Sequence, residues 1–163
     1  MKKTSKAVLA LGSNLGNRRE NLLRAVVGIE KFSFVRARSF IYETPPAGYE
    51  DQGDFLNAAV FIETEESPTE LLAHCKDLEK ELGRMERFRN GPREIDVDII
   101  FYGNEQVKSD ALEIPHPRWA ERDFVVSPLL DLLDGGLFDD EIFGEVKRML
   151  SDRPKMFPPF GAF

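Results

Sequence analysis

The sequence has 163 residues, of which 42% are hydrophobic and 31% charged, and it carries 22 basic against 29 acidic side chains. This length suits one domain with a sizeable core, so we expect residues 1–163 to form a single domain, and the composition excludes a disordered or fibrous chain. The formal net charge of −7 argues against a general nucleic-acid or membrane binder, because either would favour a surplus of Lys and Arg.

The first residues resemble a signal peptide only in their basic start. The apolar run at residues 7–11 is shorter than the hydrophobic region of a secretory signal, and it ends in Gly-Ser-Asn. Cys75 is the single cysteine, so no internal disulfide can form, and no stretch has the length of a transmembrane helix. We therefore expect a cytoplasmic protein.

The chain opens with a predicted strand, turn and helix. Residues 6–11 form the strand, which is closed by the turn "GSNLGN" at residues 12–17. Asn17 can cap the following helix with Glu20 in its third position, and apolar residues recur there at helical spacing.

Two strands joined by a long loop come next. Residues 33–43 alternate apolar and polar side chains, as a strand with one solvent-facing side does, and residues 55–64 predict a second strand. The loop "TPPAGYEDQGD" at residues 44–54 is longer than a tight turn needs. A loop of this kind tends to be functional.

A second helix has clear boundaries. Ser67 is a helix cap, Pro68 and Glu70 occupy the first and third positions, and Gly83 ends the helix. Its apolar stripe consists of Leu71, Cys75, Leu78 and Leu82. With a strand at residues 95–103, the order β-α-β-β-α-β predicts an α+β, ferredoxin-like fold, in which two helices cover one face of an antiparallel sheet.

The pattern beyond Gly103 is less regular. We expect a C-terminal extension on the same core, with a helix near residues 141–150. The tail "FPPFGAF" at residues 157–163 can dock on the domain or on a partner, and the sequence leaves both open.

Two aspartates interrupt the last predicted strand. Alternation places Asp96 and Asp98 on one face, with Cα atoms roughly 6.5 to 7 Å apart. The opposite, core face is expected to hold Ile95, Val97, Ile99 and Phe101. The two carboxylates repel each other unless cations lie near them, and Mg²⁺ prefers such oxygen ligands. The alternative is the solvated face of an edge strand.

The loop before the aspartates carries four arginines within ten positions, namely Arg84, Arg87, Arg89 and Arg93. Guanidinium groups match phosphate oxygens, so arginines beside metal-binding carboxylates suit a nucleoside triphosphate. In the alternative, a solvated loop pairs the arginines with Glu81, Glu86 and Glu94, and we expect this for one or two of the four.

The two histidines differ in their surroundings. His74 lies on the second predicted helix and is assigned no role. His116 stands between two prolines, with Arg118 and Arg122 close behind. A rigid histidine beside arginines suits a contact with phosphate, and a purely structural turn explains the segment equally well.

Four segments together resemble the 6-hydroxymethyl-7,8-dihydropterin pyrophosphokinases of folate biosynthesis. They are "ALGSNLGNRRENL" (10–22), "YETPPAGYEDQGDFLNAAV" (42–60), "GRMERFRNGPREIDVDIIFYG" (83–103) and "IPHPRWAERDFVVSPLLDL" (114–132). The resemblance implies that the pterin hydroxymethyl oxygen attacks the β-phosphorus of ATP and that AMP leaves. The implied partners are ATP and 6-hydroxymethyl-7,8-dihydropterin, without nucleic acid or membrane, and we expect a monomer.

The same resemblance assigns residues to the phosphate chemistry. Asp96 and Asp98 would bind two Mg²⁺ ions that bridge the ATP phosphates and the substrate hydroxyl, while Arg84 and Arg93 would stabilise the transferring group. The implied ATP contacts are Glu79, Arg84, Arg93, Ile99, His116 and Arg122.

The pterin contacts implied by the resemblance are Thr44, Pro45, Pro46, Ala47, Phe55, Asn57 and Phe124. Phe55 and Phe124 would sandwich the flat ring, and the amide of Asn57 would bind its polar edge. Taken alone, each phenylalanine is better explained by core packing, and only the joint placement with Asn57 favours the sandwich. The loops at residues 44–54 and 84–93 are expected to close over the substrates.

Some positions depart from the family pattern. Glu86 and Asn90 replace the arginine and tryptophan found in many members, and Pro117 replaces a tyrosine found in some, which leaves loop closure and adenine contacts open.

Two other functions compete with this assignment. A nucleotidyltransferase pairs a Gly-Ser turn with a D-x-D strand, but in those proteins the two lie close together in the chain, whereas most of the domain separates Gly12 and Ser13 from Asp96 here. A non-catalytic binding module on the same scaffold would not need two strand carboxylates beside four arginines.

Overall fold

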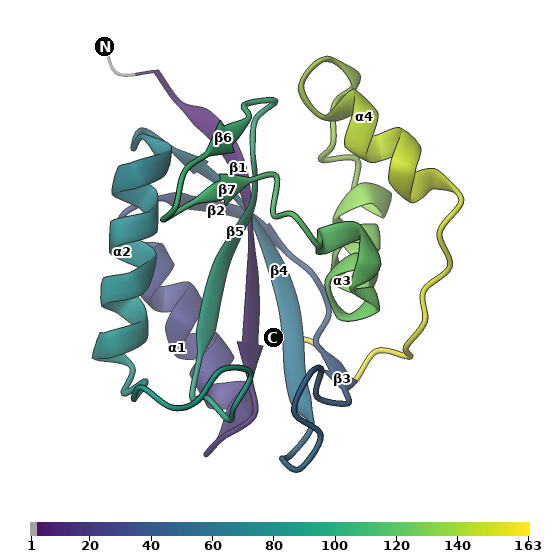
Figure 1. The fold of residues 1–163 in the computed structure, drawn as a ribbon. Helices are drawn as coiled ribbons and strands as arrows, with labels where there is room; N and C mark the ends of the chain where they lie inside the picture. Colours follow the sequence, from purple (N-terminus) through teal and green to yellow (C-terminus); the bar gives the residue numbers. More distant parts are fainter. Residues whose placement is uncertain (1–2) are drawn as a thin grey trace.

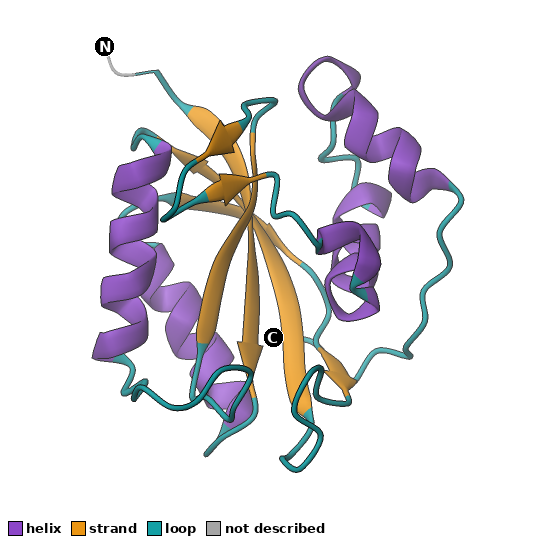
Figure 2. Ribbon diagram, viewed as in Figure 1, coloured by secondary structure: helices purple, strands orange, loops and turns teal. Residues whose placement is uncertain are grey.

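The computed structural model describes residues 3–163 as a five-stranded sheet with helices on both faces, together with a two-stranded hairpin (Figures 1 and 2). The core elements are β1 (Ser5–Ser13), α1 (Arg18–Ile29), β2 (Phe34–Arg38), β3 (Tyr42–Thr44), β4 (Phe55–Thr64), α2 (Pro68–Glu81) and β5 (Asp96–Tyr102). The strands are ordered β2-β4-β1-β5, β3 also pairs with β4, and all pairs are antiparallel. The predicted α+β arrangement is confirmed.

The two core helices begin where their capping residues predict. Asn17 accepts a hydrogen bond from the backbone of Glu20 at 3.1 Å. At α2 the Ser67 hydroxyl accepts from the backbone of Glu70 at 3.2 Å, and the Glu70 carboxylate accepts from the backbone of Ser67 at 3.0 Å. Gly83 follows α2 with a φ of 94°, which ends the helix at low steric cost.

The strand predicted over residues 33–43 is divided into β2 and β3. At the break, Ser39 exchanges hydrogen bonds with Ala59 of β4, donating from its backbone at 2.9 Å and accepting at its hydroxyl at 2.8 Å. The hydroxyl takes the place of a backbone carbonyl, which interrupts the regular ladder. Both pieces still pair with β4.

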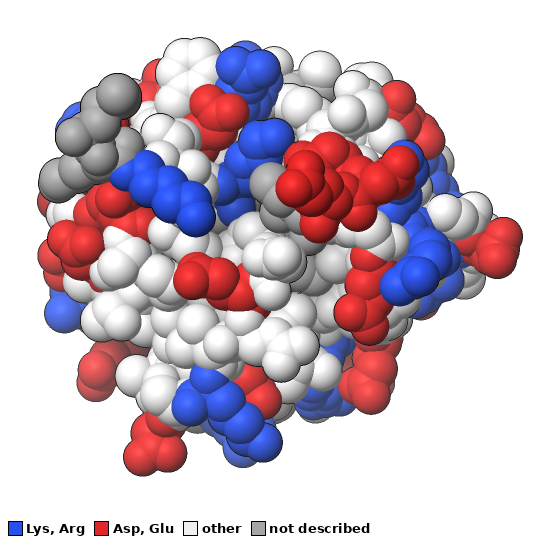
Figure 3. Space-filling view, turned by 90° about the horizontal axis from the view of Figure 1, so that it is seen from above, with Lys and Arg blue, Asp and Glu red and all other residues white. Residues whose placement is uncertain are grey.

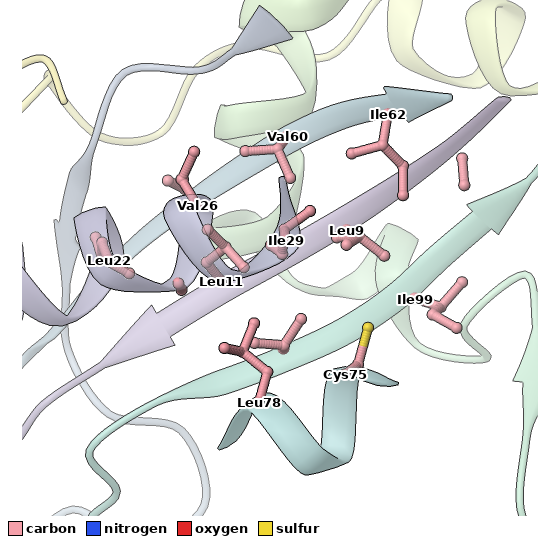
Figure 4. Packing of buried hydrophobic residues seen from close by; sticks show 14 of the residues in the cluster. Leu9, Leu11, Leu22, Val26, Ile29, Val60, Ile62, Cys75, Leu78 and Ile99 are labelled. Carbon is pink, nitrogen blue, oxygen red and sulfur yellow. The ribbon is translucent and has the colours of Figure 1, made fainter. Parts of the chain in front are cut away.

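The sheet separates two apolar cores. On one face α1 and α2 cover a buried cluster that includes Leu9, Leu22, Ile62 and Cys75 (Figure 4). On the other face α3 (Asp123–Asp134) and α4 (Asp140–Ser151) cover a second cluster. Its aromatic members are Phe61, Phe101, Trp119, Phe138 and Phe143. The core predicted under two helices is therefore one of two apolar cores in the domain.

The prediction for Phe101 is wrong, because its side chain lies on the α3 face. Val8 pairs with Phe101 and Leu9 with Ile99, so Ile100 is an extra residue in β5. A bulge of this kind reverses the alternation beyond it. Ile100 and Phe101 consequently both join the second cluster, whereas Ile99 stays under α1 and α2.

The C-terminal extension folds onto the same domain. It consists of the hairpin β6 (Val107–Lys108) and β7 (Glu113–Ile114), a 3-10 turn (Trp119–Glu121), α3 and α4. The tail returns to the sheet edge, where the backbone of Ile41 donates to Gly161 at 2.8 Å and accepts from Phe160 at 2.7 Å. Of the two alternatives for the tail, the structure shows docking on the domain.

The surface carries charges of both signs (Figure 3), as the numbers of acidic and basic residues predict. On the face seen in Figure 3, acidic and basic side chains are interspersed with uncharged ones. Within residues 3–163, every helix is too short or too polar to cross a membrane.

Candidate active site

Three neighbouring strands place the candidate site residues in one row. Gly12 of β1 pairs with Asn57 of β4 on one side and with Asp96 of β5 on the other, and Ala10 pairs with Asp98. Asp96 and Asp98 line a single cleft on the face opposite α1 and α2. The register therefore separates the amide of Asn57 from the carboxylates by one strand.

Most of the candidate site residues line this cleft. It contains Thr44, Pro45, Ala47, Phe55, Asn57, Arg93, Asp96, Asp98, His116, Arg122 and Phe124. Pro46 lies in an adjoining groove, while Glu79 and Arg84 line a second depression that shares Arg93 with the cleft. Ile99 is 4% exposed in the core under α1 and α2, so its side chain does not join the others, and its ATP contact stays a prediction.

Asp96 is held by two arginines. Arg84 Nη1 lies 2.7 Å from Asp96 Oδ1, and Arg93 Nη1 lies 3.4 Å from Asp96 Oδ2. The Nε of Arg93 is buried and has no hydrogen-bond partner among the described residues. Arg93 therefore keeps a donor for a further acceptor beside Asp96.

Asp98 has weaker compensation for its charge. The nearest ammonium is Lys76 Nζ, which lies 4.0 Å from Asp98 Oδ1. Although 37% of its side chain is exposed, desolvation by the surrounding protein, and then repulsion from Asp96, raise the pKa of Asp98 to about 7. A proton or a metal cation would relieve this unfavourable charge.

Glu79 is a buried carboxylate behind the acid pair. Its side chain is 5% exposed, and Oε2 accepts from the backbone of Val97 at 2.8 Å and pairs with Arg84 at 2.9 Å. Oε1 lies 3.3 Å from Lys76 Nζ. In this structure Glu79 acts as a support that fixes Arg84 and the start of β5.

Two of the four arginines behave differently from Arg84 and Arg93. Arg87 forms a two-pronged pair with Glu94, at 2.7 and 2.8 Å, and these hydrogen bonds lower the pKa of Glu94 to about 2. Arg89 is exposed. The solvated-loop alternative therefore describes Arg87, as expected for one or two members of the set.

Two aromatic rings face the cleft, each beneath an arginine. The guanidinium of Arg93 lies 5.4 Å from the ring centre of Phe55, and that of Arg122 lies 5.7 Å from the ring centre of Phe124. In the same cleft, Asn57 Nδ2 donates to Thr44 Oγ1 at 2.6 Å. A flat polar ring could stack on these aromatic groups and meet the Asn57 amide.

His116 enters the cleft from the segment after β7. Its backbone donates to Ile100 at 3.0 Å, which ties the segment to β5. Burial, and then the nearby Arg122, lower the pKa of His116, so the imidazole is neutral at physiological pH. A neutral ring can donate one hydrogen bond to a phosphate oxygen.

Gly12 is a site residue that the sequence presents only as part of a turn. A Cβ atom at this position would lie 3.1 Å from Asn57 Oδ1 and 3.6 Å from the Phe55 ring. The missing side chain keeps the floor of the cleft open between β4 and β5. The sequence shows a glycine after an apolar strand, but it does not show that Asn57 and Phe55 lie next to this glycine.

The acid pair fits a metal that is bound together with a substrate. Within residues 3–163 there is no cluster of three or more His, Cys, Asp and Glu side chains able to hold a metal alone. Mg²⁺ commonly takes one or two carboxylates and completes its coordination with water and substrate phosphates. Asp96 and Asp98, beside arginines, offer that donor set.

Comparisons with known proteins agree with this chemistry. A family model described as 7,8-dihydro-6-hydroxymethylpterin-pyrophosphokinase matches residues 8–134. The chain is 45% identical over 124 residues to 2-amino-4-hydroxy-6-hydroxymethyldihydropteridine pyrophosphokinase of Aquifex aeolicus, covering 76% of this chain and 78% of that protein. The enzyme of the same name from Bacillus subtilis is 45% identical over 128 residues, covering 77% of each.

Other relatives are longer than this chain. A folic acid synthesis protein of Dictyostelium discoideum is 48% identical over 124 residues, which cover 76% of this chain but 19% of that protein. The structure of wild-type Plasmodium falciparum HPPK-DHPS with pteroate has a TM-score of 0.64 at 16% identity, covering 80% of this chain and 39% of that chain, and so supports the fold. The predicted family is confirmed: this chain belongs to the 7,8-dihydro-6-hydroxymethylpterin-pyrophosphokinases.

Proposed function

We propose that this protein transfers the pyrophosphoryl group of ATP to 6-hydroxymethyl-7,8-dihydropterin and releases AMP, as a step in folate biosynthesis. The observation that carries the proposal is the single cleft in which Phe55, Asn57 and Phe124 adjoin Asp96 and Asp98. A ring-binding half and a phosphate-binding half thus lie within reach of one another. Family membership supports the same reaction.

The phosphate-binding half would hold the triphosphate of ATP with its metal ions. Asp96 and Asp98 would bind two Mg²⁺ ions, which supply charge neutralisation when bound. Arg84 and Arg93 now contact Asp96 at 2.7 and 3.4 Å, and their guanidinium groups would pair with phosphate oxygens instead once the carboxylate is occupied. Both arginines would then stabilise charge on the transferring group.

His116 and Arg122, which line the same cleft, would also bind the phosphates. Arg122 stays charged at physiological pH, while the neutral imidazole of His116 donates a hydrogen bond. Glu79 would act from behind by fixing Arg84, with which it pairs at 2.9 Å. Ile99 would contribute through its backbone, because its side chain is buried.

The pterin-binding half would orient the nucleophile. Phe55 and Phe124 would stack on the two faces of the ring, and Asn57 and Thr44 would bind its polar edge. The backbone of Pro45, Pro46 and Ala47 would complete that edge. With both substrates aligned, the hydroxymethyl oxygen bonds to the β-phosphorus and gives up its proton to water. The bond between the β-phosphorus and the α,β-bridging oxygen breaks, and AMP leaves with that electron pair.

We further propose that residues 1–163 act as a single domain, as a monomer, in the cytoplasm. One sheet carries both apolar clusters of the described residues, which supports the single domain. Two relatives, from pea and Arabidopsis thaliana, are named as mitochondrial bifunctional proteins, so a fractionation experiment with a tagged chain would test the compartment.

An assay of AMP formation tests the reaction directly. Purified protein is incubated with ATP, Mg²⁺ and 6-hydroxymethyl-7,8-dihydropterin, and nucleotides and pterins are separated by chromatography. We expect AMP and a pterin diphosphate in equal amounts, neither of which forms without the pterin or with a chelator. ADP as the nucleotide product, or AMP release that does not depend on the pterin, would overturn the proposal.

A further inference from the structure

The C-terminal residues lie outside the region that matches the family. The family model ends at residue 134, whereas residues 152–163, here called the docked tail, follow α4. In Figure 1 this yellow segment runs from the end of α4 past α3 to β3. Both α3 and β3 carry residues of the cleft, namely Phe124 on α3 and residues 44–47, here called the β3 wall, at the end of β3. The docked tail therefore joins two sides of the ring-binding half from outside.

Arg153 holds the turn that precedes α3. Its Nη1 donates to the carbonyl of Ala120 at 2.9 Å, and its Nη2 lies 3.4 Å from Asp123 Oδ1. These two contact points flank Arg122 in the chain, and Phe124 follows directly. Because Arg122 provides no side-chain cap for α3, Arg153 supports a helix start that lacks a cap of its own.

Lys155 joins the docked tail to a buried carboxylate between α3 and β3. Its Nζ lies 2.7 Å from Asp131 Oδ1, and the side chain of Asp131 is 8% exposed. The same carboxylate accepts from the Tyr42 hydroxyl at 2.8 Å and from the backbone of Phe40 at 3.0 Å. Burial, and then the hydrogen bond to Asp131, raise the pKa of Tyr42, so its hydroxyl keeps the proton that it donates. Lys155 supplies a positive charge that a buried carboxylate requires.

Phe157 lines a groove that adjoins the cleft. Its half-buried ring borders this groove together with Phe124 and Pro46, one from each side of the ring-binding half. Beyond Phe157 the docked tail is hydrogen-bonded to the backbone of Ile41, just before β3, at 2.7 and 2.8 Å. Among residues 3–163, those that line the cleft itself include no member of the docked tail. Any effect of the tail on a substrate must therefore pass through Phe124, the β3 wall or Arg122.

The metal-binding part of the cleft lies further from the docked tail. Asp96 and Asp98 belong to β5, and two strands, β4 and β1, lie between β3 and β5 in the sheet. Arg122 is the exception among the phosphate contacts, because Arg153 holds residues on both sides of it. Loss of Phe157 should thus affect the pterin alone, whereas loss of Arg153 should affect both substrates.

We propose that the docked tail positions the pterin, because Phe157 and Arg153 keep Phe124 and the β3 wall at the separation that a flat ring needs. Aromatic rings attract each other over a narrow range of centroid distances, about 4.5 to 7 Å, so a wall that moves outward loses its contact with the ring. Phe157 and Arg153 are positioning residues in this arrangement. The inference rests on the proposed function, since it places the pterin between Phe55 and Phe124.

Steady-state kinetics of AMP formation separate positioning from general support. In Phe157→Ala the groove loses its ring, and we expect the KM for the pterin to rise about three- to tenfold, as the loss of an aromatic contact would cause. The KM for ATP, and kcat at saturating pterin, should stay within about twofold of their original values. A merely structural role would instead lower kcat through unfolded protein and leave both KM values unchanged.

Arg153→Ala should give a different result. We expect the KM values for the pterin and for ATP to rise together, each about fivefold, because the variant loses the hydrogen bond that holds the turn at Ala120. Arg153→Lys keeps a donor that can reach the same carbonyl, so it should restore part of both losses.

A matched control and a milder variant complete the test. Phe34→Ala makes the same truncation at a side chain that is 60% exposed, and Phe34 pairs with Glu63 at the end of β4 away from Asn57. Its KM values should match those of the unmodified protein. Phe157→Leu retains an apolar side chain and should raise the KM for the pterin about threefold, which keeps the proposal testable if the alanine variant does not fold. Thermal unfolding of each variant reports stability separately.

The possible results distinguish the role of the docked tail from the reaction itself. An unchanged KM for the pterin in folded Phe157→Ala and Phe157→Leu, or an equal rise in Phe34→Ala, would overturn the proposal for the tail and leave the proposed function standing. If the unmodified protein forms no AMP, the proposed function fails, and calorimetry with 6-hydroxymethylpterin tests the tail alone. Weaker pterin binding in Phe157→Ala than in Phe34→Ala would then support the positioning role, and equal binding would overturn it.

Discussion

The two faces of the sheet use the same strands for opposite purposes. Along β1, Leu9 and Leu11 point into the closed core under α1 and α2, while the intervening Ala10 and Gly12 face the cleft. Along β5, Val97 belongs to that core, and its neighbours Asp96 and Asp98 face the cleft. At this end of the sheet, large apolar side chains thus close one face, and small or charged ones open the other.

The second face is itself divided along its length. Beyond the bulge in β5, Ile100 and Phe101 join the second apolar cluster with Phe61 and Phe143. Before the bulge the same face carries the carboxylates and the open floor at Gly12. A cleft therefore requires no separate domain here, because side-chain size and one inserted residue decide where the sheet is covered.

The largest expected effect comes from removing a carboxylate from the open face. Asp96→Asn loses one negative charge of the acid pair and the partner of Arg84 and Arg93. We expect the rate of AMP formation to fall by about 10² to 10³-fold, the usual cost of losing one electrostatic contact in a transition state. Steady-state kinetics would measure the fall, and circular dichroism would verify the fold.

Asp110→Asn provides the control for that variant, because Asp110 is exposed in the β6–β7 hairpin. Its activity should equal that of the unmodified protein. A similar loss in both variants would show that the chemistry does not depend on the position of Asp96.

A truncation on the closed face should reduce stability and leave the chemistry intact. Leu9 is 0% exposed between the strands and the helices, and Leu9→Ala should lower the free energy of unfolding by about 3 kcal/mol. Urea denaturation measures this change, while kcat per folded molecule should stay as it was. Lost activity without lost stability would contradict the division of roles between the faces.

A methyl group added to the floor of the cleft should affect one substrate only. In Gly12→Ala the new Cβ would lie 3.1 Å from Asn57 Oδ1, and we expect it to weaken pterin binding by about tenfold, equivalent to about 1.4 kcal/mol of crowding. Titration calorimetry should show nucleotide affinity unchanged. Gly144→Ala, where a Cβ would meet nothing within 4 Å, is the matched control and should alter neither affinity.

The smallest effect concerns pH in the metal-free protein. The pKa of Asp98 is raised from 3.8 to about 7 in the folded state, so the folded state holds this proton more tightly than the unfolded state. The resulting stabilisation is fully present below about pH 4 and is lost as the pH rises through about 7. Asp98→Asn removes this titrating group. The free energy of unfolding of the unmodified protein should therefore fall relative to that of the variant as the pH rises from 5 to 8.

Urea denaturation at the two pH values measures this difference. A difference that stays the same at pH 5 and pH 8 would show that Asp98 ionises with an ordinary pKa. Mg²⁺ added at pH 8 should reduce the difference in free energy of unfolding between the two proteins, because the cation neutralises the Asp98 carboxylate of the unmodified protein.

Local patterns in the sequence predicted much of this arrangement. The capping residues Ser67 and Glu70 predicted where α2 begins, and alternation along β5 predicted that Asp96 and Asp98 share a face. These features depend on neighbours a few residues apart. The resemblance of four segments to the family added the candidate residues for ATP and pterin binding, which spacing alone could not supply.

Features that depend on distant partners were not predictable in the same way. The face of Phe101 is set by a bulge that appears only when β5 is aligned with β1, and the end of β2 is set by the hydroxyl of Ser39 bonding across to β4. Asn14 is hydrogen-bonded to both Arg93 and Gln52, which lie far from it in the sequence. Such contacts arise from register and packing, for which a single sequence holds no periodic signal.

A crystal structure with Mg²⁺, a non-hydrolysable ATP analogue and 6-hydroxymethylpterin tests the central claim most directly. We expect metal ions on the carboxylates of Asp96 and Asp98, and the pterin ring between Phe55 and Phe124 with its hydroxymethyl group directed at the β-phosphorus. Metal ions bound elsewhere, or a pterin outside the cleft floored by Gly12, would contradict it.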